Sequence, residues 1–153
     1  MSKIMKAKKS SDVNLPLRTV VTSLLTTAIL MGASPSMAAN STDMAKLKTT
    51  KKCEDCNLKG SNLKGMNLQG VDLYRTLLND ADLTGANLQG AYMRRTDLRG
   101  ANLTNANLSG AELTNAYLQN ANLIGANLSE ANLEYSTFCK TTMPDGTVKN
   151  DNC

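Results

Sequence analysis

ANLTNANLSGAELTNAYLQNANLIGANLSEANL, at residues 101–133, repeats one five-residue pattern without a break in phase. The same phase runs through residues 56–140 as seventeen units. In most units a small residue lies two positions before the centre, Asn or Asp lies one before it, and Gly often lies two after it. The architecture therefore has to be inferred from the repeat before anything else. The central residues are Leu58, Leu63, Leu68, Leu73, Leu78, Leu83, Leu88, Met93, Leu98, Leu103, Leu108, Leu113, Leu118, Leu123, Leu128, Leu133 and Phe138.

A period of five fits neither a single helix nor a single strand. On an α-helix the leucines would spiral around the surface, and on a continuous strand alternate leucines would face opposite sides. All of them become buried if the chain makes a short extended segment, turns and repeats. The Asn, Asp and Gly positions supply that turn, because these residues tolerate positive φ and form local hydrogen bonds. Four sides close one coil of twenty residues, and coils stack at about 4.8 Å.

These units resemble the A(D/N)Lxx pattern of pentapeptide-repeat proteins. The resemblance covers residues 56–140 and implies an all-β fold, a right-handed quadrilateral β-helix of about four coils. It also implies a scaffold with a filled interior, and it implies little about chemistry. The Cys-x-x-Cys before the repeats and FCKTTMPDGTVKNDNC after them resemble exported cyanobacterial members of the family, including proteins of the thylakoid lumen.

Residues 1–38 are typical of an export signal. A basic leader precedes an apolar run from Thr19 to Gly32, and Ser36-Met37-Ala38 offers small residues for cleavage. The alternative is an uncleaved anchor, although the run is short for a membrane span. The absence of a twin arginine favours the general secretory route to the periplasm or the thylakoid lumen.

The leader carries the whole excess of positive charge. The chain has 17 Lys and Arg against 13 Asp and Glu, and residues 1–38 contain five of the basic residues and Asp12. Residues 39–153 therefore carry 12 of each sign. This balance argues against nucleic acid as a partner, because a targeting segment and not the mature domain is basic.

Residues 39–55 are predicted to be a linker and cap. A short helix is expected after Asn40 or Ser41, both of which are suitable N-caps. Met44 and Leu47 are three residues apart, so one face of that helix can cover the open apolar end of the first coil. At the other end, residues 141–153 are predicted to form a C-terminal cap with a turn at Pro144-Asp145-Gly146.

Four cysteines lie at the two ends of the repeats. In the expected fold the two pairs are several coil rises apart, whereas a disulfide needs Cα atoms within about 7 Å. If all four pair, only Cys53–Cys56 and Cys139–Cys153 are compatible, and export makes oxidation plausible. The Cys-x-x-Cys could instead be a thiol redox motif or half of a zinc site. The first lacks a βαβ context and the second lacks further ligands.

The residues needed for catalysis are missing from the chain. It contains no histidine, no glycine-rich phosphate loop and no calcium loop. Because a filled tube also has no obvious cleft, we expect no enzymatic activity, no metal and no cofactor.

One side of the expected coil differs from the others. The units VDLYR, AYMRR, AELTN and ANLEY, centred on Leu73, Met93, Leu113 and Leu133, form what we call the Tyr/Arg face. Tyr and Arg are enriched at protein interfaces, so this face is the candidate partner surface. The alternative is an ordinary charged surface with Tyr74 stacked on Arg94. The candidate residues, including two from the adjoining face, are Asp72, Tyr74, Arg75, Tyr92, Arg94, Arg95, Arg99, Glu112, Tyr117 and Tyr135.

We therefore expect an exported, non-enzymatic scaffold that binds a protein or envelope component, with its oligomeric state open. The second hypothesis is a DNA-mimicking inhibitor of topoisomerases, a role that some pentapeptide-repeat proteins have. That role calls for a strongly acidic cytoplasmic rod, and the balanced charge and the leader argue against it. A third class, an ice- or surface-binding lattice, would need a flat threonine ladder, and the column of Lys64, Thr84, Thr104 and Ile124 is not one.

Overall fold

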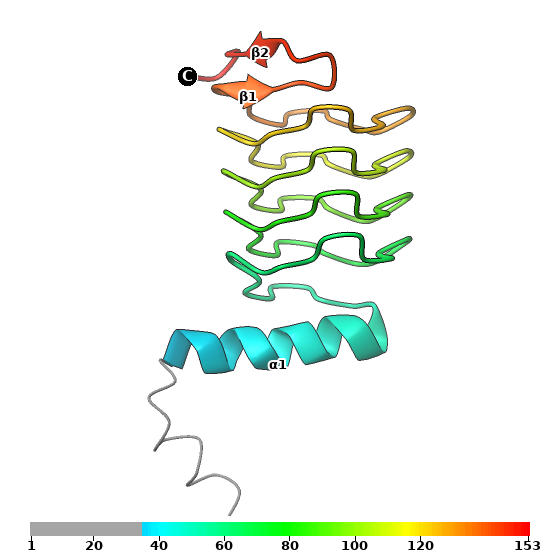
Figure 1. The fold of residues 1–153 in the computed structure, drawn as a ribbon, viewed down its shortest axis with the longest axis vertical. Helices are drawn as coiled ribbons and strands as arrows, with labels where there is room; N and C mark the ends of the chain where they lie inside the picture. Colours follow the sequence, from blue (N-terminus) through cyan, green and yellow to red (C-terminus); the bar gives the residue numbers. More distant parts are fainter. Residues whose placement is uncertain (1–34) are drawn as a thin grey trace, which may run out of the picture. The chain divides into compact units, whose positions relative to one another are not determined.

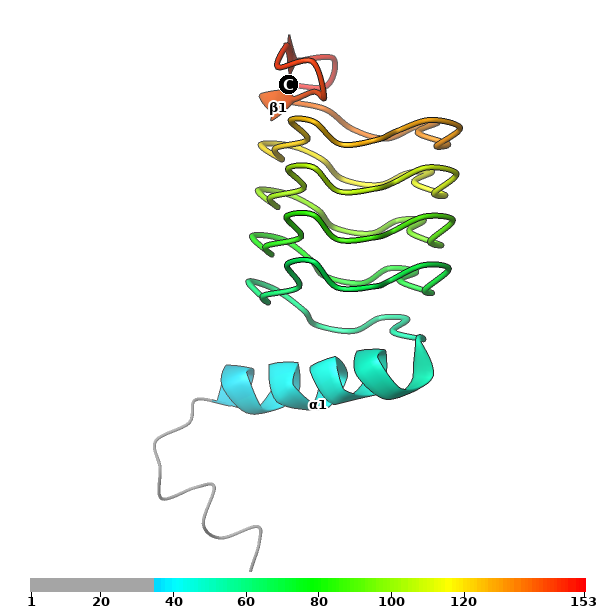
Figure 2. The ribbon, with the colours of Figure 1, turned by 45° about the vertical axis from the view of Figure 1, so that its right-hand side comes forward.

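The computed structural model describes residues 35–153; the predicted signal segment, apart from its last four residues, lies outside them. Within this part, helix α1 (Pro35–Thr50) lies across one end of a stack of coils (Figure 1). Strands β1 (Thr141–Thr142) and β2 (Val148–Lys149) lie at the other end. Figure 2 shows the same stack from the side, with one coil directly above the next. Among residues 35–153, no helix is both long and apolar enough to cross a membrane.

Each turn of the coil takes twenty residues. Parallel bridges join residues twenty apart without interruption, from Lys52 with Asp72 to Asn122 with Thr142. Within a unit, the N–H of the central residue donates to the next coil, as Leu58 does to the carbonyl of Leu77 at 2.8 Å. The four-sided period inferred from the sequence is therefore the period of the backbone ladder.

The other positions of the five-residue repeat form the turns between the sides of the coil. The carbonyl of each central residue up to Leu133 accepts the N–H three residues on, and the residue two after the centre has positive φ, as Gly90 does at 63°. The Asn or Asp before the centre accepts the N–H two residues ahead, as Asn67 does from Gln69. On the face of Leu68 these asparagines also bond to each other, through Asn67, Asn87, Asn107 and Asn127.

The leucine column fills the axis of the coil. Leu83, Leu88 and Leu108 are fully buried, and alanines such as Ala86 and Ala111 pack beside them. Leu128 and Leu133, in the last coil, are only partly buried, because the next coil is absent above them. The interior is a continuous apolar core that leaves no room for a central site.

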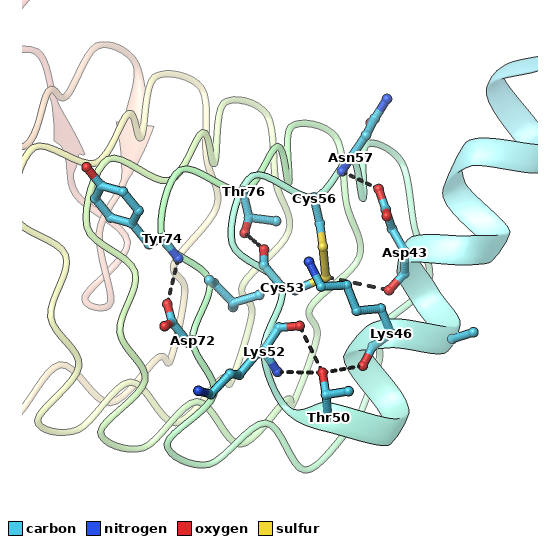
Figure 3. The surroundings of a disulfide bond; sticks show 12 residues. Asp43, Lys46, Thr50, Lys52, Cys53, Cys56, Asn57, Asp72, Tyr74 and Thr76 are labelled. Atoms are coloured by element: carbon cyan, nitrogen blue, oxygen red, sulfur yellow. Dashed lines mark hydrogen bonds between the residues drawn. A yellow bond between two sulfur atoms is a disulfide. The ribbon is translucent and has the colours of Figure 1, made fainter.

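Helix α1 seals the first coil. Leu47 is buried and Met44 packs against the core, as predicted. The Asp43 carboxylate accepts the N–H of Asn57 at 2.7 Å, a donor that has no coil beneath it (Figure 3). Asp43 takes the place of one missing carbonyl, so the helix covers the apolar end of the first coil and also satisfies one backbone donor at this edge.

The C-terminal tail closes the opposite end. Strands β1 and β2 pair antiparallel, with Thr141 opposite Lys149, around a turn at Pro144–Gly146. Phe138 fills the axis under this hairpin, and its backbone exchanges hydrogen bonds with Asn152. Disulfides join Cys53 to Cys56 and Cys139 to Cys153.

Two boundaries differ from the sequence predictions. The helix begins at Pro35 and not after Asn40 or Ser41, because proline suits a first helical turn, where its missing N–H has no partner to lose. The ladder begins at Lys52 and continues to Thr142, beyond residues 56–140 at both ends. Cys53 occupies the centre of the extra first unit and is fully buried, so the segment read as a cap already forms coil.

Candidate partner surface

The predicted surface residues form columns that rise along the coil. Asp72, Tyr92 and Glu112 are linked by successive bridges and therefore form one column of the Tyr/Arg face. Tyr92 is exposed, whereas Asp72 and Glu112 are half-buried. The Asp72 carboxylate accepts the N–H of Tyr74 at 3.1 Å, so it serves the local turn (Figure 3).

The corner that follows the Tyr/Arg face contains no glycine. Its turn positions all have positive φ. This conformation costs a residue with a side chain about 1–2 kcal/mol. The corners after the faces of Leu63 and Leu68 mostly use glycine for it, and the corner after the face of Leu58 uses Gly60 and Gly100 beside non-glycine residues. Strained positions retained without glycine are candidate functional sites. The five residues are Asp55, Arg75, Arg95, Asn115 and Tyr135.

Buried hydroxyls tie the coils together at this same corner. The hydroxyl of Thr96 donates to the carbonyl of Leu73 at 2.8 Å, and that of Ser136 donates to Leu113 at 2.7 Å. Thr76 makes the equivalent bond to the carbonyl of Cys53. Alanine was the residue expected at this inward position, and the hydroxyl bonds add support where the turn lacks glycine.

A pocket of about 550 Å³ opens at this corner, between the Tyr/Arg face and the adjoining face. Three of its residues come from the glycine-free turns, three precede the central leucine of the next unit in each coil, and Arg99 follows Leu98. We call it the corner pocket. It is lined by Asp55, Arg75, Leu77, Arg95, Asp97, Arg99 and Tyr117.

Two of the three arginines in the corner pocket are paired. Arg75 Nε lies 3.0 Å from Asp55 Oδ1, in an exposed ion pair. Arg99 binds Asp97 with both ends of its fork, through Nε at 2.8 Å and Nη2 at 2.6 Å. Within residues 35–153, Arg95 has neither an ion pair nor a side-chain hydrogen bond.

Asp97 is the buried charge of the corner pocket, with 7% of its surface exposed. Burial alone would raise the pKa of its carboxyl. The hydrogen bonds from the side chain and backbone of Arg99, together with the Arg99 charge, outweigh burial and hold the pKa below its usual value. The Asp97 carboxylate is therefore charged and already paired with Arg99, so it is not available to bind another cation.

The structure groups the predicted residues unevenly. Arg75 and Arg95 line the corner pocket together with Arg99 and Tyr117. Tyr74, Arg94 and Tyr135 do not line it, and Tyr135 is 79% exposed near the C-terminal end.

The cation–π contact found among the described residues is Lys149 over Phe138, at 4.1 Å, and not Tyr74 with Arg94. Arg75 pairs with Asp55, a residue that the sequence pattern assigns to the linker and that the structure places in the first coil.

Three residues of the corner pocket were missed: Asp55, Leu77 and Asp97. Leu77 carried a usable signal, because it stands where most units have Asn or Asp and is 42% exposed. Within the residues that the structure describes, no group of three or more potential metal ligands comes together. The corner pocket presents arginine and tyrosine, which are enriched at protein interfaces, together with the exposed Leu77.

The repeat is shared with a known family. The family model described as pentapeptide repeats matches in eight copies, over residues 52–90, 76–115 and 106–143. These limits agree with the ladder seen in the structure, from Lys52 to Thr142. No curated protein sequence matches the chain.

Solved structures of other repeat proteins resemble it. HetL of the cyanobacterium Nostoc sp. strain PCC 7120, a pentapeptide-repeat protein involved in regulating heterocyst differentiation, is 32% identical with a TM-score of 0.56. The alignment covers 64% of this chain and 51% of HetL, so the chain spans about half the length of that protein. Rfr23 of the cyanobacterium Cyanothece 51142 is 29% identical over 63% of this chain and 92% of its own, with a TM-score of 0.47.

Proposed function

The chain belongs to the pentapeptide-repeat family, and we propose that it is an exported, non-enzymatic scaffold that binds another protein through the Tyr/Arg face and the corner pocket. The β-helix fold and the general role of a scaffold follow from the family. Its members fold as right-handed quadrilateral β-helices and act generally as scaffolds. The export and the particular surface are proposals for this chain. The compartment that we propose is the periplasm or the thylakoid lumen.

The observation that carries the proposal is the glycine-free corner. A coil needs only turn-forming residues there, and the plain face of Leu68 has Gly70, Gly90 and Gly110 in the equivalent place. Arginine at positions 75 and 95 costs conformational energy and places positive charge in neighbouring coils. Such a cost is accounted for if the arginines contact something outside the coil.

Two further observations support a protein partner over nucleic acid. Residues 39–153 carry equal numbers of acidic and basic residues, so the domain has neither a broad basic surface nor the acidic surface of a DNA mimic. The corner pocket also exposes Leu77 and Tyr117 beside its arginines, and mixed apolar and arginine contacts are characteristic of protein interfaces. HetL, of which the alignment with this chain covers 51%, is involved in regulating heterocyst differentiation.

Capture of partners with matched variants tests the proposal. Tagged wild-type protein, Arg75→Ala with Arg95→Ala, and Gln69→Ala with Gln89→Ala on the plain face are incubated with envelope extract of the source organism. We expect the arginine variant to lose at least one protein that the other two recover, without a lower melting temperature. If all three recover the same proteins, this face is only solvated surface.

A further inference from the structure

The charges inside the corner pocket do not balance. Its two carboxylates are each bound by an arginine, Asp55 by Arg75 and Asp97 by Arg99. The third arginine, Arg95, is exposed and has no polar partner for its side chain within residues 35–153. The pocket therefore has one positive charge in excess, which suits a single anionic group.

Apolar side chains flank that charge. Leu77, Asp97 and Tyr117 are joined by successive bridges and so form one column, with the matched Asp97 in the middle. Leu77 and Tyr117 are 42% and 46% exposed, which is unusual for large apolar residues in a coil whose other bridge positions are mainly polar. An occupant should therefore present apolar surface next to its anionic group.

A disulfide and two paired charges hold residues on the two walls of the pocket. Cys53 and Cys56 are disulfide-bonded and buried in the first coil (Figure 3). Asp55 lies between them in the sequence. The disulfide fixes the turn that presents Asp55 to Arg75, and the two-pronged bond of Arg99 to Asp97 fixes the opposite wall. Fixed walls leave Arg95 as the group free to bind, at little cost in conformational entropy to its surroundings.

We propose that the corner pocket binds an acidic side chain of a partner protein that stands next to an apolar residue, with Arg95 taking the carboxylate and Leu77 and Tyr117 the apolar neighbour. This inference rests on the proposed function and specifies the partner's chemistry. The volume of about 550 Å³ and the single excess charge fit a short peptide segment. A nucleic acid would meet the paired carboxylates Asp55 and Asp97 along with Arg95.

Selection from a phage-displayed random peptide library on the full-length protein, with both disulfides intact, provides the probe. We expect enriched peptides to carry Asp or Glu adjacent to an aliphatic or aromatic residue. For a synthetic peptide of the enriched sequence, Arg95→Gln should raise the Kd about 10-fold to 100-fold, as expected for loss of a charge-assisted bond. Arg94→Gln is the matched control, because Arg94 is an exposed arginine of the same face that does not line the pocket.

Several outcomes would overturn the inference. These are enriched peptides without acidic residues, equal weakening by Arg95→Gln and Arg94→Gln, and tighter binding of a duplex oligonucleotide than of the peptide. Capture of native partners distinguishes failure of the peptide-binding pocket from failure of the proposed scaffold function. If Arg94→Gln with Tyr92→Ala loses the native partner and Arg95→Gln keeps it, the face binds proteins outside the pocket and only the present inference fails.

Discussion

At the scale of single residues, the left-handed turn positions show where stability and binding conflict. Arg95 has φ of 57°, and glycine would adopt this conformation without steric cost. We expect Arg95→Gly to raise the free energy of unfolding by about 0.5–1 kcal/mol, since relief of the turn exceeds the entropy lost by glycine. Gly90→Ala, at φ of 63° with open space around it, should lower it by about 1 kcal/mol.

Urea unfolding of both variants, followed by circular dichroism, measures these two changes. The two variants are controls for each other. At similar positive φ, one replaces a side chain with glycine and the other replaces glycine with a side chain. If Arg95→Gly is destabilising, then arginine contributes to the fold at this corner, and its positive φ does not indicate a binding role.

The Asp97 carboxylate gives a second prediction at this scale. A carboxyl with a depressed pKa stabilises the fold above its unfolded value of about 3.9, and this contribution is lost as the pH falls through the lower folded value. Asp97→Asn should therefore lower stability by about 1 kcal/mol at neutral pH, a modest amount because the Arg99 side chain is exposed.

Melting temperatures of wild type and Asp97→Asn between about pH 7 and pH 2 test that sign. The difference between the two proteins should be constant at neutral pH and should shrink below about pH 3.9. A difference that is independent of pH would show that Asp97 acts through its shape and hydrogen bonds and not through its charge.

At the scale of elements, the caps depend on different kinds of contact. Cys53 and Cys56 are buried and close a very short loop, whereas Cys139 and Cys153 are fourteen residues apart and tie the tail with β2 over Phe138. A cross-link over a loop of about that length is worth about 3 kcal/mol through the unfolded chain. We expect Cys139→Ser with Cys153→Ser to lower the free energy of unfolding by about that amount.

Hydrogen exchange locates the effect of removing this disulfide. Protection should fall first in residues 138–153, while the coils around Leu88 and Leu108 stay protected, since each coil contacts only its neighbours. Uniform loss of protection along the coil would instead mean that the tail and the repeats unfold as one cooperative unit.

At the scale of the whole molecule, the repeat could be predicted from the sequence and the corner pocket could not. The leucine column and the twenty-residue turn follow from the period, and Met44 and Leu47 follow from the need to cover an open end. The pocket depended on the coil starting one unit earlier, at Lys52, which brings Asp55 beside Arg75. Which arginine stays unpaired is set by distances between coils, and a repeat pattern does not contain them.

Export gives the last prediction, and it also belongs to the whole chain. Residues 1–34 lie outside the described part, but α1 begins at Pro35, so cleavage after Ala38 would remove the first turn of this helix. The contacts that seal the coil come from Asp43, Met44 and Leu47, which all follow the cleavage site. We therefore expect the exported protein to begin at Ala39, as intact-mass and N-terminal sequencing of an envelope fraction would show.

We also expect residues 39–153 to melt at the same temperature as the full chain. A mature protein that keeps the run from Thr19 to Gly32 would contradict cleavage and favour an anchored scaffold. A large drop in melting temperature for residues 39–153 would instead show that the cap needs the first turn of α1.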